Sequence, residues 1–127
     1  MWFDPSMNDA YEHGIKKAIA TCGFRSLRID AKETNNKICD EIIAEIRRSR
    51  FLVADFTEHR GGVYFEAGFA LALGLPVIWT CRTDQLEELH FDTRQYSHVV
   101  WSNPDELYSK LVNRIAATIP GARLPEE

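Results

Sequence analysis

The stretch GGVYFEAGFALALG, residues 61–74, holds one carboxylate, Glu66, among residues that are otherwise apolar or small. Removing an unpaired carboxylate from water is costly, so it either sits at an edge with partners or takes part in chemistry. On a helix over 62–73, Glu66 falls in the first turn or just past it, where the helix dipole favours an anion. A carboxylate held in this way suits the role of a nucleophile that attacks the anomeric carbon of a sugar. A carboxylate that only caps backbone amides is the alternative.

Glycosidic chemistry also needs a second acidic group, which protonates the leaving group or holds a sugar hydroxyl. The candidates by position are Asp4, Asp30, Asp55 and Asp92. Asp55 ends the short apolar run RFLVADF, a pattern typical of a strand that is buried on both faces. The alternative for Asp55 is a carboxylate that only caps a helix or a loop.

Strand and helix signals alternate along the chain and must position these acids. The pattern predicts strands over 1–3, 24–29, 50–56, 77–81 and 98–101, and helices over 7–22, 37–48, 62–73 and 102–119. This alternation indicates an α/β fold with a parallel sheet covered by helices on both sides. In such sheets ligands bind at the carboxyl ends of the strands.

Two features of these elements stand out. The helix over 62–73 is apolar on almost every side, so we expect it to be buried. The first strand, Met1 to Phe3, has only three residues, whereas an ordinary strand has about five or six. Either this strand is truncated, or the first strand is supplied in another way.

Composition excludes several classes of function. The 127 residues carry a formal net charge of -4, with no basic surplus for nucleic acid or an anionic membrane. Three cysteines without metal-site spacing indicate buried free thiols in a reducing cytoplasm. The four histidines show no ligand spacing, so no metal and no cofactor are expected. No apolar run is long enough to span a bilayer. We expect one domain over 1–119 and a loosely held tail over 120–127.

The segment FLVADFTEHRGGVYFEAGFALALGLPVIW, residues 51–79, resembles the nucleoside 2-deoxyribosyltransferase superfamily. The matching pieces are Asp55, Gly62, Glu66, Gly68, Ala70, Gly74 and Pro76. MWFDPSMNDAYEHGIKKAI and RID...NNKICDEIIAEIRRSRF resemble the first two strand-helix units of a bacterial branch, and HFDTRQYSHVVW resembles the last strand region. The likeness covers about residues 1–118.

The resemblance implies a flavodoxin-like three-layer α/β/α sandwich with a five-stranded parallel sheet in the order 2-1-3-4-5. It implies that Glu66 is the nucleophile that forms a glycosyl-enzyme, and that Asp55 contacts the substrate and assists proton transfer. An aromatic residue near the end of the first strand, Trp2 or Phe3, matches one that positions the glutamate; plain core packing is the alternative for both. A homo-oligomer, a dimer or larger, is also implied.

Nucleotide-hydrolysing relatives hold the 5′-phosphate with a Gly/Ser-rich loop after the first strand, whereas WFDPSMND contains no glycine. A phosphate could instead meet the amides of Gly61 and Gly62, with Arg60 or His59 nearby. The alternative for both side chains is a solvated loop. Asp92 lies in HFDTRQY, which is either a lid over the substrate or a surface loop.

Together these features predict cleavage of the N-glycosidic bond of a nucleoside or nucleotide, by deoxyribosyl transfer or by hydrolysis. One alternative is a binding module that keeps a nucleotide pocket without turnover. Another is NAD hydrolysis of the kind carried out by TIR domains, which are also flavodoxin-like and use a glutamate; that comparison rests on fold alone.

Overall fold

The computed structural model describes residues 7–28, 40–55, 57, 61–83 and 98–123, with only the backbone described at 41–42 and 61–64. Within these ranges the chain has an α/β fold with a three-stranded parallel sheet and four α-helices. The strands are β1 (Leu52–Asp55), β2 (Val77–Arg82) and β3 (His98–Trp101). The helices are α1 (Lys16–Thr21), α2 (Asp40–Arg48), α3 (Gly61–Ala72) and α5 (Pro104–Thr118), and a π-helical segment, η2 (Ala10–Ile15), leads into α1.

The sheet has the order β1-β2-β3, and both pairs of strands are parallel. Leu52 lies opposite Val77, and Trp79 lies opposite His98. The three strands predicted over 50–56, 77–81 and 98–101 are therefore confirmed, and they are neighbours in chain order. The remaining part of the order 2-1-3-4-5 stays a prediction.

The segment 24–28 has no β-bridge to another described residue, and residue 29 lies outside the described part, so the strand predicted over 24–29 stays a prediction. A strand is defined by hydrogen bonds to a neighbour. Among the described residues none lies between this segment and β1 to supply such bonds. The predicted first strand, residues 1–3, lies outside the described residues.

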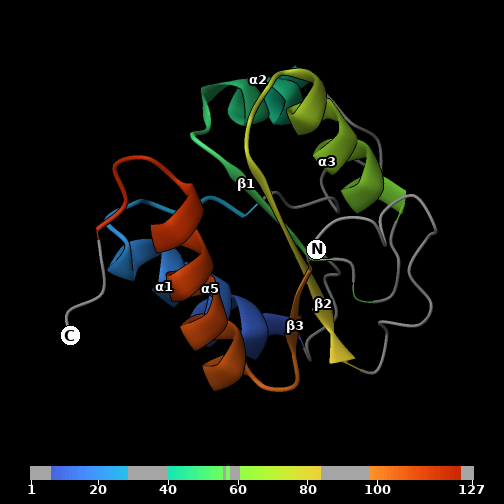
Figure 1. Cartoon of the computed structure of the whole chain (residues 1–127). Coiled ribbons are helices and arrows are strands. Elements are labelled where there is room, and N and C mark those ends of the chain that lie inside the picture. The colour runs from blue at the N-terminus through green and yellow to red at the C-terminus, as the bar shows by residue number, and fades with distance from the viewer. Residues whose placement is uncertain (1–6, 29–39, 56, 58–60, 84–97, 124–127) are drawn as a thin grey trace.

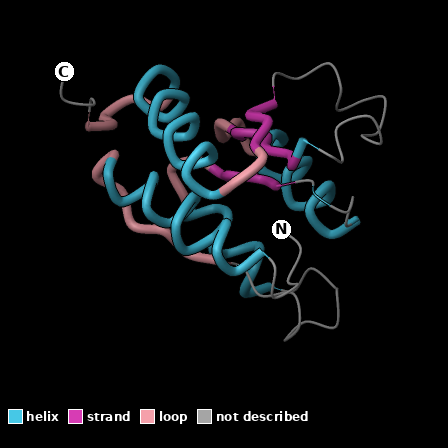
Figure 2. The backbone as a smooth tube through the Cα atoms, turned by 90° about the horizontal axis from the view of Figure 1, so that it is seen from below, coloured by secondary structure: helices cyan, strands magenta, loops and turns pink. Residues whose placement is uncertain are grey.

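Helices cover both faces of the sheet, as predicted (Figure 1; Figure 2). α1, η2 and α5 lie on one face, and α2 and α3 lie on the other. Side chains along β2 alternate between the two faces of the sheet. Ile78 joins the cluster formed with α1 and α5, whereas Trp79 and Cys81 pack with Ala67 of α3. Cys22 and Cys81 are free and buried, as predicted; Cys39 lies outside the described residues.

The start of α5 agrees with its sequence signals. The Asn103 side-chain oxygen accepts a hydrogen bond from the Glu106 backbone N–H at 2.9 Å, and Pro104 stands at the first helical position. The Glu106 carboxylate accepts a bond from the Ser102 backbone N–H at 2.9 Å. These bonds satisfy donors that a helix start otherwise leaves open, which fixes where α5 begins behind β3.

A glycine sets how closely η2 approaches α5. A Cβ built on Gly14 would lie 2.7 Å from Leu107 Cδ2 and 3.2 Å from Leu107 Cβ, and both residues are buried. We expect Gly14→Ala to lower the free energy of unfolding by about 1–3 kcal/mol, because the added methyl overpacks this contact. Urea denaturation of the variant and the parent chain measures the difference.

Gly68→Ala is the matched control. Gly68 also lies in a helix, but nothing stands within 4 Å of the position that a Cβ would take there, and its backbone angle is not left-handed. Alanine should therefore raise the free energy of unfolding by about 0.5–1 kcal/mol through helix propensity. Equal effects of the two substitutions would contradict the packing argument.

The expectation that α3 is buried on all sides is wrong for one side of the helix. Ala67 and Ala70 are fully buried toward the sheet and α2, but Phe65 is 57% exposed and Leu71 is 39% exposed. Just beyond the helix, Leu73 is 44% exposed. The cause is geometric, because the sheet covers one side of α3 and α2 covers part of another. An uncovered apolar face remains.

Candidate functional site

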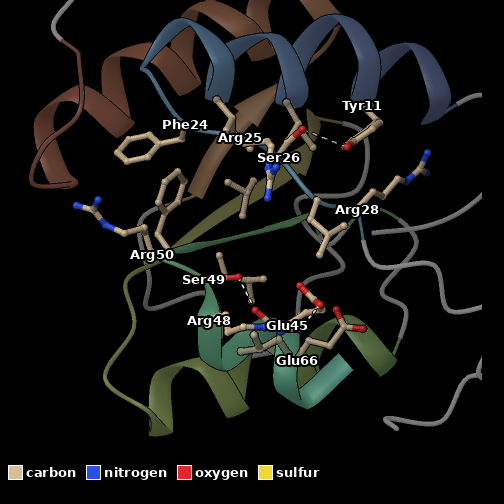
Figure 3. A pocket seen from close by; sticks show the side chains of 17 residues that line it. Tyr11, Phe24, Arg25, Ser26, Arg28, Glu45, Arg48, Ser49, Arg50 and Glu66 are labelled. Carbon is tan, nitrogen blue, oxygen red and sulfur yellow. Dashed lines mark hydrogen bonds and ion pairs between the residues drawn. The ribbon is translucent and has the colours of Figure 1, made fainter. Parts of the chain in front are cut away.

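A cavity of about 720 Å³ opens between the segment 24–28 and β1, with Glu66 at its wall (Figure 3). Its floor is apolar, and charged side chains stand around it. The described residues that line it are Tyr11, Ile15, Ile19, Phe24, Arg25, Ser26, Leu27, Arg28, Glu45, Ile46, Arg48, Ser49, Arg50, Phe51, Leu52, Val53 and Glu66. Its size lies in the range typical of small-molecule sites.

Glu66 is the sixth residue of α3, just past the first turn, which is the second of the two positions that the sequence predicts. The helix begins at Gly61, and no acidic residue lies in its first turn. Because the effect of the helix dipole falls off within one turn, the dipole stabilises the Glu66 anion less than the sequence suggested. The side chain is half-buried, and this burial raises the pKa of the Glu66 carboxyl above its ordinary value of 4.5. The protein thus holds Glu66 where ionisation costs free energy.

This raised pKa has a consequence for stability. A carboxyl whose pKa is higher in the folded chain favours folding in its protonated form, and the advantage is lost as the pH rises through the folded pKa. Glu66→Gln, which cannot ionise, should therefore be more stable than the parent chain at pH 7. The difference should shrink as the pH falls toward 4.5, the ordinary pKa. Thermal unfolding from pH 4 to pH 8 tests this, and an advantage that does not change with pH would contradict it.

Asp55 is fully buried, and both of its carboxylate oxygens accept hydrogen bonds. Oδ1 accepts from the Thr57 backbone N–H at 3.0 Å. Oδ2 accepts from the Thr80 hydroxyl at 2.6 Å and from Trp101 Nε1 at 2.9 Å. The carboxylate thus ties the ends of β1, β2 and β3 together, and the bond to Thr57 is the loop cap that the sequence offered as an alternative. We call this set the Asp55 network.

Asp55 and Glu66 belong to opposite faces of the sheet. Val53 packs in the cluster formed with α1 and α5, and Asp55, two residues further along β1, points to the same side. Trp101, which binds Asp55, belongs to that cluster as well. Glu66 comes from α3 on the other face (Figure 1). Among the described contacts, no hydrogen bond links Asp55 to Glu66.

Most of the other predicted substrate-binding residues lie outside the described residues. These are Trp2, Phe3, Asp4, Asp30, Arg60 and Asp92. Gly61 and Gly62 form the first residues of α3, with only their backbone described. The phosphate contact predicted for their amides therefore stays a prediction.

The sequence pattern did not reveal that α2 provides a charged wall of the cavity. Glu45 and Arg48, one turn apart on α2, form an ion pair at the cavity (Figure 3). The Ser49 hydroxyl also donates to the Glu45 backbone carbonyl at 2.7 Å. Arg47 and Arg48 lie in the last turn of α2 and Arg50 follows it, where cations complement the helix dipole, so the sequence alone does not single out this basic run as part of a site. Glu45 is nonetheless the one other carboxylate among the described residues that line the cavity.

The described residues offer neither a metal-binding cluster nor a membrane-spanning helix. They contain no group of three or more histidine, cysteine, aspartate or glutamate side chains that could hold a metal ion. No helix among them has both the length and the apolar character needed to cross a membrane. Comparison of the chain with protein-family models, curated proteins and solved structures finds no match. The site must therefore be interpreted from its own chemistry.

Proposed function

We propose that this chain cleaves the N-glycosidic bond of a nucleoside or nucleotide, with Glu66 as the nucleophile. The observation that carries the proposal is the placement of Glu66: a half-buried carboxylate on a regular helix, at the wall of a cavity of about 720 Å³. The resemblance of residues 51–79 to the nucleoside 2-deoxyribosyltransferase superfamily supports the same role. A carboxylate on a helix is held more firmly than one on a loop, which favours repeated attack in one geometry.

The proposed reaction has two steps. The Glu66 carboxylate attacks C1′ of the sugar, the bond from C1′ to the base nitrogen breaks, and the base leaves with a proton taken from solvent water. A second base or a water molecule then attacks C1′, gives up a proton to solvent and releases the Glu66 carboxylate, which gives transfer or hydrolysis respectively. The Asp55 network suggests a supporting role for Asp55, because both of its oxygens already accept hydrogen bonds.

The proposal is tested by incubating the chain with deoxynucleosides, their 5′-monophosphates and NAD, and by measuring free base by chromatography. Release from deoxynucleosides or monophosphates that grows linearly with enzyme concentration is the expected result. Adding a second free base separates transfer from hydrolysis, because only transfer yields a new nucleoside. Release from NAD alone would favour the NAD hydrolase alternative.

The second candidate is a binding module without turnover, and one observation favours it. Asp55, the acid that the resemblance assigns to proton transfer, is fully buried and already accepts three hydrogen bonds. A pocket with Glu66 but without a mobile proton donor would bind a nucleotide and leave it intact. Isothermal titration that detects nucleotide binding, together with no base release from any compound of the panel, would support this module.

The uncovered face of α3 supports the proposal that the chain forms homo-oligomers. Phe65 is 57% exposed, and the described side chains of α3 other than Glu66 are apolar or small, so no charge on this face favours a different, charged partner.

We expect Phe65→Glu to shift the chain toward monomer by raising the dissociation constant of the oligomer at least about tenfold, because a charge would be buried on association. Sedimentation at several concentrations measures this. Ala117→Glu is the control, because Ala117 is exposed on α5, which lies on the other face of the sheet from α3. A parent chain that is monomeric throughout contradicts the expectation.

A further inference from the structure

Thr57 joins the end of β1 to the end of β2. It is fully buried and lies two residues beyond Asp55, the last residue of β1. Its backbone N–H donates to Asp55 Oδ1 at 3.0 Å, and its side-chain oxygen accepts the Arg82 backbone N–H at 3.2 Å. Because Arg82 is the last residue of β2, this side chain links the two strands independently of the bond between Thr80 and Asp55. Thr57 is therefore anchored from two directions.

This anchor stands at the entrance to α3. The helix begins at Gly61, four residues after Thr57, and residues 58–60 lie outside the described part of the chain. Four residues reach at most about 14 Å, so the position of Thr57 limits where α3 can begin. Glu66 follows within two turns on the same helix. Whatever fixes the start of α3 therefore also restrains Glu66.

The contacts that α3 makes with its neighbours restrain Glu66 only in part. Among the described side chains of the helix, the fully buried ones are Ala67 and Ala70, and Phe69 beside them is half-buried. Alanine methyl groups bury little apolar area, so a helix that packs through them can shift along the sheet at a small cost in free energy. Burial also disfavours the ionised form of Glu66, which favours movement of this side chain toward water. An anchor at the start of the helix opposes both movements.

We propose that Thr57 is a positioning residue, which holds α3 in place on the sheet and thereby keeps Glu66 at the wall of the cavity. The proposal rests on the proposed function for the reaction that Glu66 carries out, but the placement of Glu66 can be measured without that reaction. A displacement of about 1 Å in a reacting group can lower the rate on the order of a hundredfold. Such an anchor therefore acts on the chemical step more than on substrate binding.

Thr57→Val tests the anchor, because valine keeps the backbone bond to Asp55 but cannot accept the Arg82 N–H. We expect the pKa of the Glu66 carboxyl to fall by at least about 0.5, toward its ordinary value of 4.5, because a helix that can shift lets water reach this half-buried group. Titration followed by carbon NMR measures this pKa, and Glu66→Gln identifies the signal. The charged side chains that share the cavity with Glu66 are unchanged in the variant: Arg25, Arg28, Glu45, Arg48 and Arg50.

Kinetic constants separate positioning from substrate binding. Thr57→Val should lower kcat for base release at least about tenfold and change KM by less than about twofold. Thr57→Ser keeps the hydroxyl oxygen and should restore both kcat and the pKa of Glu66. Thr57→Ala also lacks the hydroxyl and should behave like Thr57→Val; it takes the place of that variant if valine prevents folding.

Gly14→Ala is the matched control, because it disturbs packing against Leu107 of α5, on the other face of the sheet from α3. It should leave the pKa of Glu66 and kcat unchanged, at a temperature at which circular dichroism shows every variant folded. An unchanged pKa in Thr57→Val, or equal changes in Thr57→Val and Gly14→Ala, overturns the positioning role. Absence of base release from the parent chain would instead contradict the proposed function, and the pKa measurement would still decide whether Thr57 positions Glu66.

Discussion

Replacing Glu66 with glutamine should lower base release by about a thousandfold or more, because the variant keeps the shape of the side chain but lacks the anion that attacks C1′. Glutamine also avoids the cost of ionising a half-buried group, so the variant should remain folded at neutral pH. Single-turnover assays with the deoxynucleoside that the parent chain cleaves best measure the loss. The parent chain should also show a burst of base release, because the glycosyl-enzyme forms before it is resolved.

Glu45→Gln is the matched control for this experiment. Glu45 is the second carboxylate at the same cavity, and it forms an ion pair with Arg48. Its removal changes the charge of the cavity by the same amount as the removal of Glu66. We therefore expect Glu45→Gln to lower base release by less than about tenfold, since an exposed ion pair contributes little to holding the site together. Equal base release by the parent chain and by Glu66→Gln would rule out Glu66 as the nucleophile, and equal losses in the two variants would assign the effect to cavity charge.

The pH dependence of the reaction should follow the same group. The nucleophile must be ionised, and burial raises the pKa of Glu66 above 4.5. Base release per unit time should thus rise with pH through a value above that ordinary pKa, while the stability that the protonated carboxyl confers is lost over the same interval. A site that costs stability when it becomes active is common among enzymes, since catalytic groups are held in unfavourable environments.

The sequence predicted the regular elements well where a local signal fixes them. Asn103 and Pro104 mark the start of α5, and the apolar runs around Ala54, Ile78 and Val99 predicted three neighbouring parallel strands. These signals are local in the chain, and burial on both sides of a parallel sheet leaves a clear pattern of apolar residues. The sequence logic places Glu66 beside the carboxyl ends of the strands, whereas the cavity that Glu66 lines runs along β1 from Leu52 to Val53 and does not include Asp55.

The remaining features depend on tertiary contacts that no local pattern encodes. Phe65 looks like a core residue in sequence, but only the packing of the sheet and α2 decides which side of α3 is covered. The segment 24–28 alternates like a strand, but local alternation does not identify the neighbour that would pair with it, and no described residue does so. In the same way the sequence placed Asp55 at the end of a strand, while its partners Thr80 and Trp101 come from strands 25 and 46 residues away.

The Asp55 network leads to the largest expected effect on stability. Asp55→Ala leaves three donors without their acceptor: the Thr57 N–H, the Thr80 hydroxyl and the Trp101 Nε1–H. An unsatisfied buried donor costs about 1–3 kcal/mol, and the Thr80 hydroxyl can rotate toward another acceptor. We therefore expect a loss of about 3–5 kcal/mol in the free energy of unfolding, a large part of the roughly 5–15 kcal/mol typical of a domain. Urea denaturation followed by tryptophan fluorescence measures the loss, and Trp101 reports directly on the network.

Three comparison variants separate the network from charge and from catalysis. Thr80→Val removes one donor and leaves the carboxylate two others, so it should cost about 1–2 kcal/mol. Asp55→Asn keeps one accepting oxygen but turns an amide N–H toward a donor, and it should fall between the two. Asp105→Ala, at an exposed position in the first turn of α5, should change stability by about 0.5 kcal/mol or less. If Asp55→Asn instead retains full stability and loses base release as completely as Glu66→Gln, then Asp55 acts on the substrate, and the hydrogen bonds that occupy it must break during turnover.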